Sequence, residues 1–274
     1  MNRLFVGYKP SGISSNQFLS RIKRRYKTKK AGYSGTLDPF AKGVLIIAIG
    51  SHTRLFRFLQ KTPKTYRATL WLGAHSQTLD IEAVYQIDTI APLADEDVKN
   101  AVASLQGDLT YEPPHFSAKK VDGKRAYALA REGKAIALEP ITSHIHSIKM
   151  LHYRHPFVTF EATVSEGTYI RSLGAVIAQR LGVEGGVLSA LERLKEGKFC
   201  YNNEHPIDIK TVLDMPQNHY FGDLKTLEFG RKIALKDLTL QHEGTYWIDL
   251  GATITLIRIE AGSVSYLLNK VESC

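Results

Sequence analysis

One carboxylate is distinctive because nearly all the charged residues around it in the sequence are cations. Asp38 is the single acidic residue among residues 1–79, which contain fifteen Lys and Arg residues. Surrounding cations favour the ionised form of a carboxyl group, so Asp38 is better suited to act as a nucleophile or electrostatic stabiliser than as a general acid. The alternative is an Asp that forms a turn before Pro39, since Asp-Pro is a common loop signal.

The charge is divided unevenly along the chain. The sequence has 36 Lys and Arg and 27 Asp and Glu, a formal net charge of +9, yet residues 1–79 carry +14 and residues 80–274 carry −5. This asymmetry indicates a polyanionic partner, because neutralising backbone phosphates releases counterions. Lys23 and Arg24, in the basic run 21–30, are candidate contacts to it. Taken alone, that run also fits a solvated helix face.

Length and composition exclude several classes of protein. With 274 residues, 43% hydrophobic and 23% charged, the chain is neither disordered nor a disulfide miniprotein. No apolar run approaches the roughly 18 residues that span a bilayer, and the N-terminus lacks signal-peptide features, so we expect a cytoplasmic protein without a membrane partner. Cys200 and Cys274 follow no metal-ligand spacing and are expected to be free thiols.

Residue patterns predict the elements that hold Asp38 in place. A strand is expected at residues 3–8, followed by a helix that Ser14 or Ser15 caps. The apolar run 44–49 is typical of a strand buried on both faces, and it anchors the Asp38 loop directly before it. Further strands are expected at 66–72 and 157–164, and helices at 53–59, 95–105 and 125–132. Residues 167–171 are expected to lead into another helix that runs through Leu181. From about Tyr220 the pattern becomes β-rich, which predicts a small separate module.

Seven stretches of sequence, in a fixed order, together point to one family. They are 9–15 (KPSGISS), 31–39 (AGYSGTLDP), 66–67 (YR), 72–73 (LG), 113–118 (PPHFSA), 123–127 (GKRAY) and 167–171 (GTYIR). This set resembles the TruB pseudouridine synthases, and the resemblance spans most of residues 3–200. Members of that family convert uridine 55 in the T arm of transfer RNA to pseudouridine.

The resemblance implies which residues are catalytic. The family's catalytic aspartate falls on Asp38. Tyr66 matches the aromatic residue that stacks on the target base, which needs a replacement π-face once it leaves its neighbours. In the matching motif, Arg171 pairs with the catalytic carboxylate and keeps it ionised, and Tyr169 lies over the reacting base. Without the resemblance, Tyr66 reads as an ordinary strand residue and Arg171 as an exposed residue at the start of a helix.

The reaction is a net isomerisation that needs no cofactor and no metal. The N-glycosidic bond breaks, the uracil turns over, and the sugar rejoins the base through C5. Asp38 could attack C1′, as in retaining glycosidases, add to C6 of uracil, or remove the C2′ proton to give a glycal. The residue types do not distinguish these routes.

The resemblance also implies substrate-binding residues. Lys9 and Pro10 match a motif that supports the site. Leu191 matches a leucine of the target pocket. Asp80 matches the second acidic residue of a family loop whose first usual acid is replaced here by Gln77. Tyr33 stands where many members have a His that contacts the flipped-out RNA, and Tyr33 can still stack. Gln77, Ala83 and Glu192 are further departures from the usual Asp, Gly and Arg.

The expected fold is α+β, with a mostly antiparallel mixed sheet flanked by helices and a small β-rich C-terminal module. We expect a catalytic domain at 1–219 and, at 220–274, a reduced or divergent version of the family's RNA-binding PUA domain. An excursion at 113–140 is expected to hold RNA phosphates, with Lys119 and Arg125 as contacts. The expected state is a monomer that needs no protein partner.

Two rival functions remain open. A non-catalytic RNA-binding or tRNA-folding protein would explain the charge distribution, but not the joint occurrence of Asp38, Tyr66, Tyr169 and Arg171. A nucleoside or base glycosylase would use Asp38 as nucleophile and would release free uracil.

Overall fold

The structure is a computed structural model that describes residues 1–114, 116, 120–121, 124–125 and 138–273. Its α-helices are α1 (Ser15–Arg25), α2 (Asp95–Ala103), α4 (Ile170–Arg180) and α5 (Leu224–Glu228). Short 3₁₀ helices cover Gly50–Phe58, Ile81–Ala83, Ile209–Thr211 and Leu235–Asp237.

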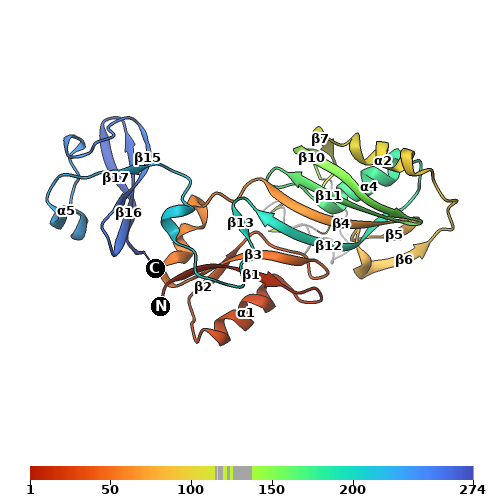
Figure 1. The fold of residues 1–274 in the computed structure, drawn as a ribbon, viewed down its shortest axis with the longest axis horizontal. Coiled ribbons are helices and arrows are strands. Elements are labelled where there is room, and N and C mark those ends of the chain that lie inside the picture. The colour runs from red at the N-terminus through yellow and green to blue at the C-terminus, as the bar shows by residue number, and fades with distance from the viewer. Residues whose placement is uncertain (115, 117–119, 122–123, 126–137, 274) are drawn as a thin grey trace.

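A nine-stranded sheet forms the centre of the molecule (Figure 1). Its main path runs β1 (Arg3–Lys9), β3 (Lys42–Ile49), β12 (Gly186–Glu196), β4 (Lys64–Leu72), β11 (Phe157–Val164), β10 (Ile141–Arg154) and β7 (Gly107–Tyr111), while β2 (Ala31–Ser34) pairs with β3 and β13 (Phe199–Cys200) with β12. All of its pairings are antiparallel except that of β12 with β3. The expected α+β class with a mostly antiparallel mixed sheet is confirmed.

Helix α1 begins where its sequence predicts. The Ser14 side chain accepts a hydrogen bond from the backbone N–H of Gln17, and the Gln17 side chain accepts one from the backbone N–H of Ser14. This reciprocal capping satisfies two donors that would otherwise lack a partner at the helix start. Phe18 and Ile22 of α1 then pack on Leu45 and Ile47 of β3.

A second core lies between the other end of the sheet and two helices. Leu70 of β4, Phe160 of β11 and Val102 of α2 belong to it, together with Leu173 and Ile177 of α4. Figure 1 shows α2 and α4 side by side at this end. Because Arg171 follows the first residue of α4, this core fixes its position relative to the sheet.

Two helices expected from the sequence differ in the structure. In place of the helix expected at 53–59, residues 53–58 belong to a nine-residue 3₁₀ helix, Gly50–Phe58, and Leu59 is extended. Arg125 lies in β9 (Lys124–Arg125), which pairs with β8 (Lys120–Val121), so a helix does not start there. The rest of the helix expected at 125–132 lies outside the described residues.

A two-stranded sheet, β5 (Ala74–Ser76) and β6 (Val84–Ile87), flanks the loop that contains Asp80.

The C-terminal part forms its own sheet of β14 (Gln217–Asn218), β15 (Gly244–Asp249), β16 (Thr253–Glu260) and β17 (Ser263–Glu272). Trp247, Leu256 and Val271 of this sheet share a buried cluster with Leu4 of β1 and Ile46 of β3. The C-terminal sheet therefore packs against this end of the nine-stranded sheet, where the His52 ring of the 3₁₀ helix Gly50–Phe58 hydrogen-bonds the carbonyl oxygen of Glu272. No helix within the described residues is long and apolar enough to cross a membrane.

Candidate active site

A cleft of about 820 Å³ brings together residues that are far apart in the sequence. Seven of the residues singled out from the sequence line it: Tyr33, Asp38, Tyr66, Asp80, Tyr169, Arg171 and Leu191. They come from β2, the loop between β2 and β3, β4, the loop after β5, the start of α4, and β12. The fold thus gathers separate stretches of the chain around one carboxylate.

The loop that carries Asp38 is fixed from two sides. Ser15 of α1 donates a hydrogen bond from Oγ to the carbonyl oxygen of Leu37 and accepts one from the Leu37 N–H, both at 3.0 Å. From the other side, Nζ of Lys9 donates to the carbonyl oxygens of Ile13 at 2.6 Å, Pro10 at 3.0 Å and Pro39 at 3.3 Å. Lys9 therefore ties the loop after β1 to the Asp38 loop.

Arg171 aims the Asp38 carboxylate. Its Nε lies 3.0 Å from Oδ2 of Asp38, and its Nη1 lies 3.5 Å from Oδ2 of Asp80. The same guanidinium donates to the carbonyl oxygens of Thr78 at 2.6 Å and Phe116 at 2.9 Å. A planar fork with several donors is held in one orientation by such contacts, so the position of Asp38 is fixed as well.

Burial raises the pKa of the Asp38 carboxyl above its ordinary value of 3.8, although the charges of Arg171 and Lys9 act in the opposite direction. The sequence-based expectation that cations alone set its ionisation is incomplete. It omitted the loss of solvation, which penalises the charged form. The Asp38 side chain is still 35% exposed and opens to the cleft, where a substrate can reach it.

Two tyrosines and a leucine supply flat and apolar surface near Asp38. Tyr66 is buried, and burial raises the pKa of its hydroxyl even though a hydrogen bond with Arg193 lowers it. The backbone N–H of Tyr169 donates to the hydroxyl of Tyr111 at 3.0 Å. This bond fixes the backbone of Tyr169, the residue just before α4. Leu191 faces the same cleft from β12.

A second charged cluster, which sequence reasoning missed, lies beside Tyr66. Arg193 donates from Nε to the carbonyl oxygen of Val44 at 2.8 Å and from Nη2 to that of Gly35 at 2.9 Å. Glu196 accepts a hydrogen bond from Ser34 at 3.0 Å and lies 3.4 Å from Arg193 and 3.7 Å from Lys64. This cluster of Arg193, Glu196 and Lys64 supports the first residues of the Asp38 loop.

Gly35 is required at the junction between the cluster and the loop. Its φ is +64°, a conformation that side chains rarely adopt. A Cβ there would lie 3.0 Å from Oε1 of Glu196 and 3.1 Å from Nη1 of Arg193. Any larger residue would therefore displace the charged cluster or the Asp38 loop.

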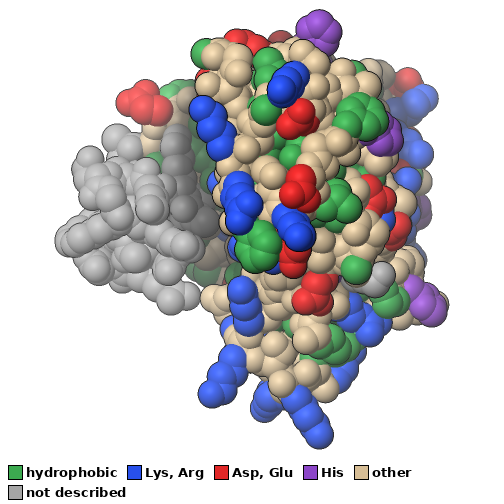
Figure 2. Space-filling view, turned by 90° about the vertical axis from the view of Figure 1, so that its left-hand side faces the viewer, with side chains coloured by type: hydrophobic (Ala, Val, Ile, Leu, Met, Phe, Trp, Pro, Cys, Tyr) green, Lys and Arg blue, Asp and Glu red, His purple; other side chains and the backbone are tan. Residues whose placement is uncertain are grey.

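The structure does not bring every candidate residue to the cleft. Lys9 is fully buried behind the Asp38 loop. Lys23 and Arg24 lie on α1, outside the cleft lining. Figure 2 shows Lys and Arg side chains gathered at the lower end of the face it presents, the end at which Figure 1 shows α1. Lys119 lies outside the described residues, and Arg125 is described only as part of β9.

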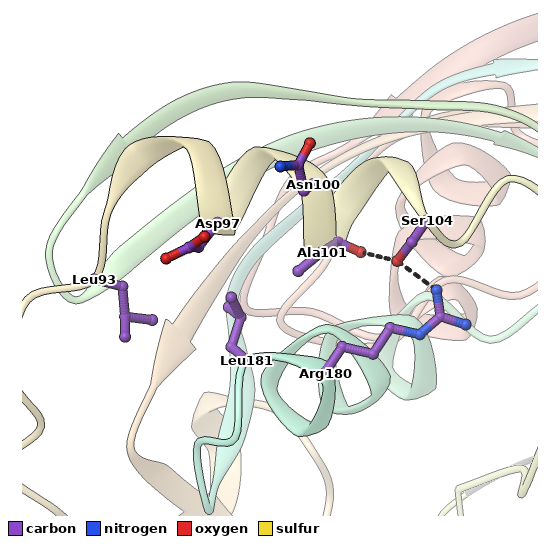
Figure 3. A pocket seen from close by; sticks show the side chains of 7 residues that line it. All are labelled: Leu93, Asp97, Asn100, Ala101, Ser104, Arg180 and Leu181. Carbon is purple, nitrogen blue, oxygen red and sulfur yellow. Dashed lines mark hydrogen bonds between the residues drawn. The ribbon is translucent and has the colours of Figure 1, made fainter.

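A second hollow of about 630 Å³ lies between α2 and α4. Figure 3 shows Arg180 of α4 donating to the hydroxyl of Ser104, which in turn donates to the carbonyl oxygen of Ala101 at 2.7 Å. Leu93, Asp97, Asn100 and Leu181 complete the lining. None of the candidate site residues from the sequence lies in this hollow.

The charged side chains around Asp38 pair with one another as ion pairs. Within the described residues, no group of three or more His, Cys, Asp or Glu side chains is arranged to hold a metal ion. Asp38 and Asp80 share the guanidinium of Arg171.

Comparison with solved structures shows the fold. The protein resembles the crystal structure of a Cbf5-Nop10-Gar1 complex, with a TM-score of 0.68 and 20% identity over 99% of this chain and 84% of that chain. A structure of an H/ACA RNP bound to a substrate RNA containing 2′-deoxyuridine gives a TM-score of 0.65 at 18% identity, again over 99% of this chain and 84% of that chain.

Sequence comparison is more specific. The model of the TruB family pseudouridylate synthase (N terminal domain) matches residues 23–170. A tRNA pseudouridine synthase B of Sulfurimonas denitrificans is 60% identical over 99% of this chain and its own entire length. One from Campylobacter jejuni strain RM1221 is 49% identical over the whole of both chains. These matches confirm the resemblance that the ordered motifs carried: the chain belongs to the TruB family of pseudouridylate synthases.

Proposed function

We propose that this protein is a tRNA pseudouridine synthase that isomerises uridine 55 in the T arm, with Asp38 as the reacting carboxylate. The observation that carries the proposal is the Asp38–Arg171 contact of 3.0 Å in a cleft that Tyr66 and Tyr169 also line. Close relatives over the full length are named tRNA pseudouridine synthase B, which supports the choice of transfer RNA.

The mechanism follows from what each side chain can do. The bond from C1′ to N1 breaks, the uracil turns, and a bond from C1′ to C5 forms, while N1 gains a proton and C5 loses one. Asp38 either attacks C1′, adds to C6, or removes the C2′ proton, and Arg171 orients it for each route. Tyr66 and Tyr169 offer aromatic faces to a base that has left its stack.

The same proposal covers recognition. Exposed basic residues of α1 and the excursion at 113–140 hold backbone phosphates of the T arm, which makes affinity dependent on salt. Residues 1–219 form the catalytic domain, and 220–274 form a short PUA-like module. The protein acts alone, as a monomer in the cytoplasm, and needs neither metal nor cofactor.

Tritium release tests this function. A T-arm stem-loop with C5-tritiated uridine at position 55 is incubated with the purified protein in EDTA. Release of tritium is expected because replacement of the C5 hydrogen is intrinsic to the isomerisation. A matched stem-loop that carries the labelled uridine only in its paired stem should release none.

The rival functions have separate readouts in the same reaction. Binding of the stem-loop without tritium release would favour a non-catalytic RNA-binding protein. Free uracil among the products would favour a glycosylase. Either result would overturn the proposed isomerase.

A further inference from the structure

Lys64 is a cation in the cleft that the mechanism above does not use. Lys64 and Tyr66 are two residues apart on β4, and alternate residues of a strand face the same side. Both line the cleft. The Lys64 side chain is 10% exposed and belongs to the cleft lining, so a small part of it is accessible from the cleft.

The ammonium group of Lys64 is held only loosely. Its Nζ lies 3.7 Å from Oε1 of Glu166 and 3.7 Å from Oε1 of Glu196, which are ion-pair distances longer than hydrogen bonds. Within the described residues its Nζ makes no hydrogen bond. It therefore has donors available for an incoming ligand, because an ammonium group carries three.

The other cleft cations are already committed. Arg171 binds Asp38, Asp80 and two carbonyl oxygens. Arg193 binds Glu196 and the carbonyl oxygens of Val44 and Gly35. The described lining also contains four carboxylates, on Asp38, Asp80, Glu82 and Glu166. An RNA phosphate that enters this cleft needs a cation to offset these charges. Among the three described cations of the lining, Lys64 is the one whose side chain makes no hydrogen bond within the described residues.

Glu166 can be displaced from Lys64 by a ligand. Its side chain is 63% exposed and it directly precedes Gly167, whose φ is +85°. An exposed ion pair contributes little, so exchanging Glu166 for a phosphate costs little. Glu196, by contrast, is fully buried and stays with Arg193.

We propose that Lys64 binds a backbone phosphate that flanks the extruded uridine, replacing its contact with Glu166. This contact would seat the nucleotide while its base lies against Tyr66, two residues along the same strand. The inference rests on the proposed function for the identity of the nucleotide, but the phosphate contact itself can be measured by binding alone.

The test measures Kd for the T-arm stem-loop from 50 to 200 mM salt, for wild type, Lys64→Ala, Lys64→Arg and Glu166→Gln. Lys64→Ala should weaken binding about tenfold at the low-salt end and reduce the slope of log Kd against log salt by about one. Lys64→Arg should retain most of the affinity, since it keeps the charge. Glu166→Gln should tighten binding about twofold, because it removes the competing carboxylate.

Lys149→Ala is the matched control. Lys149 pairs with Glu161, which also contacts Arg67, and Arg67 lies on the opposite face of β4 from Tyr66. Its removal should leave Kd and the salt slope unchanged.

The phosphate itself is then neutralised. Stem-loops with a methylphosphonate at the 5′ or 3′ phosphate of the target uridine are compared with unmodified RNA. One of them should weaken binding to wild type about tenfold and leave binding to Lys64→Ala unchanged, because the contact is already lost. Equal weakening for both proteins at both positions would overturn the proposal, as would a Lys64→Ala variant that loses kcat with an unchanged Kd.

Two further readouts keep the outcomes distinct. If Lys64→Ala does not fold, Lys64→Arg and Glu166→Gln still decide, since loss of affinity in both would contradict the phosphate contact. If wild type binds the stem-loop but releases no tritium, the proposed function fails, while the methylphosphonate comparison still tests Lys64.

Discussion

The cleft contains two buried arginines that differ mainly in the carboxylates they hold. Arg171 and Arg193 each bind two backbone carbonyl oxygens, which fixes both guanidinium groups. Arg171 faces Asp38, whose side chain is 35% exposed toward the cleft. Arg193 faces Glu196, whose side chain is 0% exposed.

This difference shows how two similar ion pairs can have separate roles. A carboxylate that a substrate can reach is able to react with it, whereas one sealed from the cleft can only position its neighbours. Glu196 and Arg193 hold Ser34 and Gly35, and so determine where the Asp38 loop begins. One pair is thus expected to govern the rate and the other to govern the stability.

Replacing Arg171 should have the largest effect on the rate. Arg171→Met should lower kcat by about 10²–10³-fold, since the carboxylate loses the partner that aims it. Arg171→Lys should recover only part of this rate, because an ammonium group lacks the planar fork. The measurement is single-turnover tritium release at saturating RNA. A rate within threefold of wild type for Arg171→Met would contradict the role given to this pair.

Replacing Glu196 should act on stability instead. Glu196→Gln should lower the free energy of unfolding by about 3 kcal/mol, because the buried charges of Arg193 and Lys64 lose their counterion. Glu166→Gln is the same chemical change at an exposed site and should alter the free energy of unfolding by less than about 0.5 kcal/mol. Denaturant titration of both variants checks this, and equal effects would show that burial of Glu196 is unimportant.

Lys9 should contribute a smaller share of stability with its own pH dependence. Lys9→Met should cost about 2 kcal/mol, since three backbone carbonyls lose a charged donor. Burial lowers the pKa of Lys9 from 10.5 to about 8. Below pH 8 the folded and unfolded states both bind the proton, and between about 8 and 10.5 the unfolded state binds more. Wild type should therefore gain stability relative to Lys9→Met as pH rises through that window.

The pH dependence of the rate provides a finer test of the Asp38 environment. Because burial raises the pKa of Asp38 above 3.8, the single-turnover rate should begin to fall at a higher pH than for an ordinary Asp. The rate is followed from pH 7 downward, with folding monitored in parallel. A profile that stays flat to below pH 3.8 in folded protein would show that Asp38 is not desolvated, or that its ionised form is not needed.

Local patterns predicted the elements around Asp38 well. The Ser14 cap, the helical spacing of Phe18 and Ile22, and the buried run of β3 each rest on interactions within a few residues. Asp38 itself was identified from its charge surroundings. Arg171 was identified only through the family motif, because its pairing joins residues 133 positions apart, which no local pattern encodes.

The Arg193–Glu196–Lys64 cluster was missed for a physical reason. Strand residues three positions apart ordinarily face opposite sides of a sheet, so Arg193 and Glu196 gave no signal of a pair. The pairing of β12 with β4 shifts its register between Arg193 and Lys195, and this irregularity places both side chains together. Charged residues in strands are also usually read as exposed, and these are not.

The central claim is that Asp38 reacts and Glu196 only supports. It is tested most directly by tritium release from the T-arm stem-loop with Asp38→Asn and Glu196→Gln side by side, with RNA binding and thermal unfolding measured on the same samples. Asp38→Asn should lose at least about 10⁴-fold in rate while it binds RNA and folds nearly as wild type does. Glu196→Gln should unfold at a lower temperature while its folded fraction turns over at a rate near that of wild type. Strong residual turnover by Asp38→Asn, or a catalytic loss in folded Glu196→Gln as large as that of Asp38→Asn, would contradict the account.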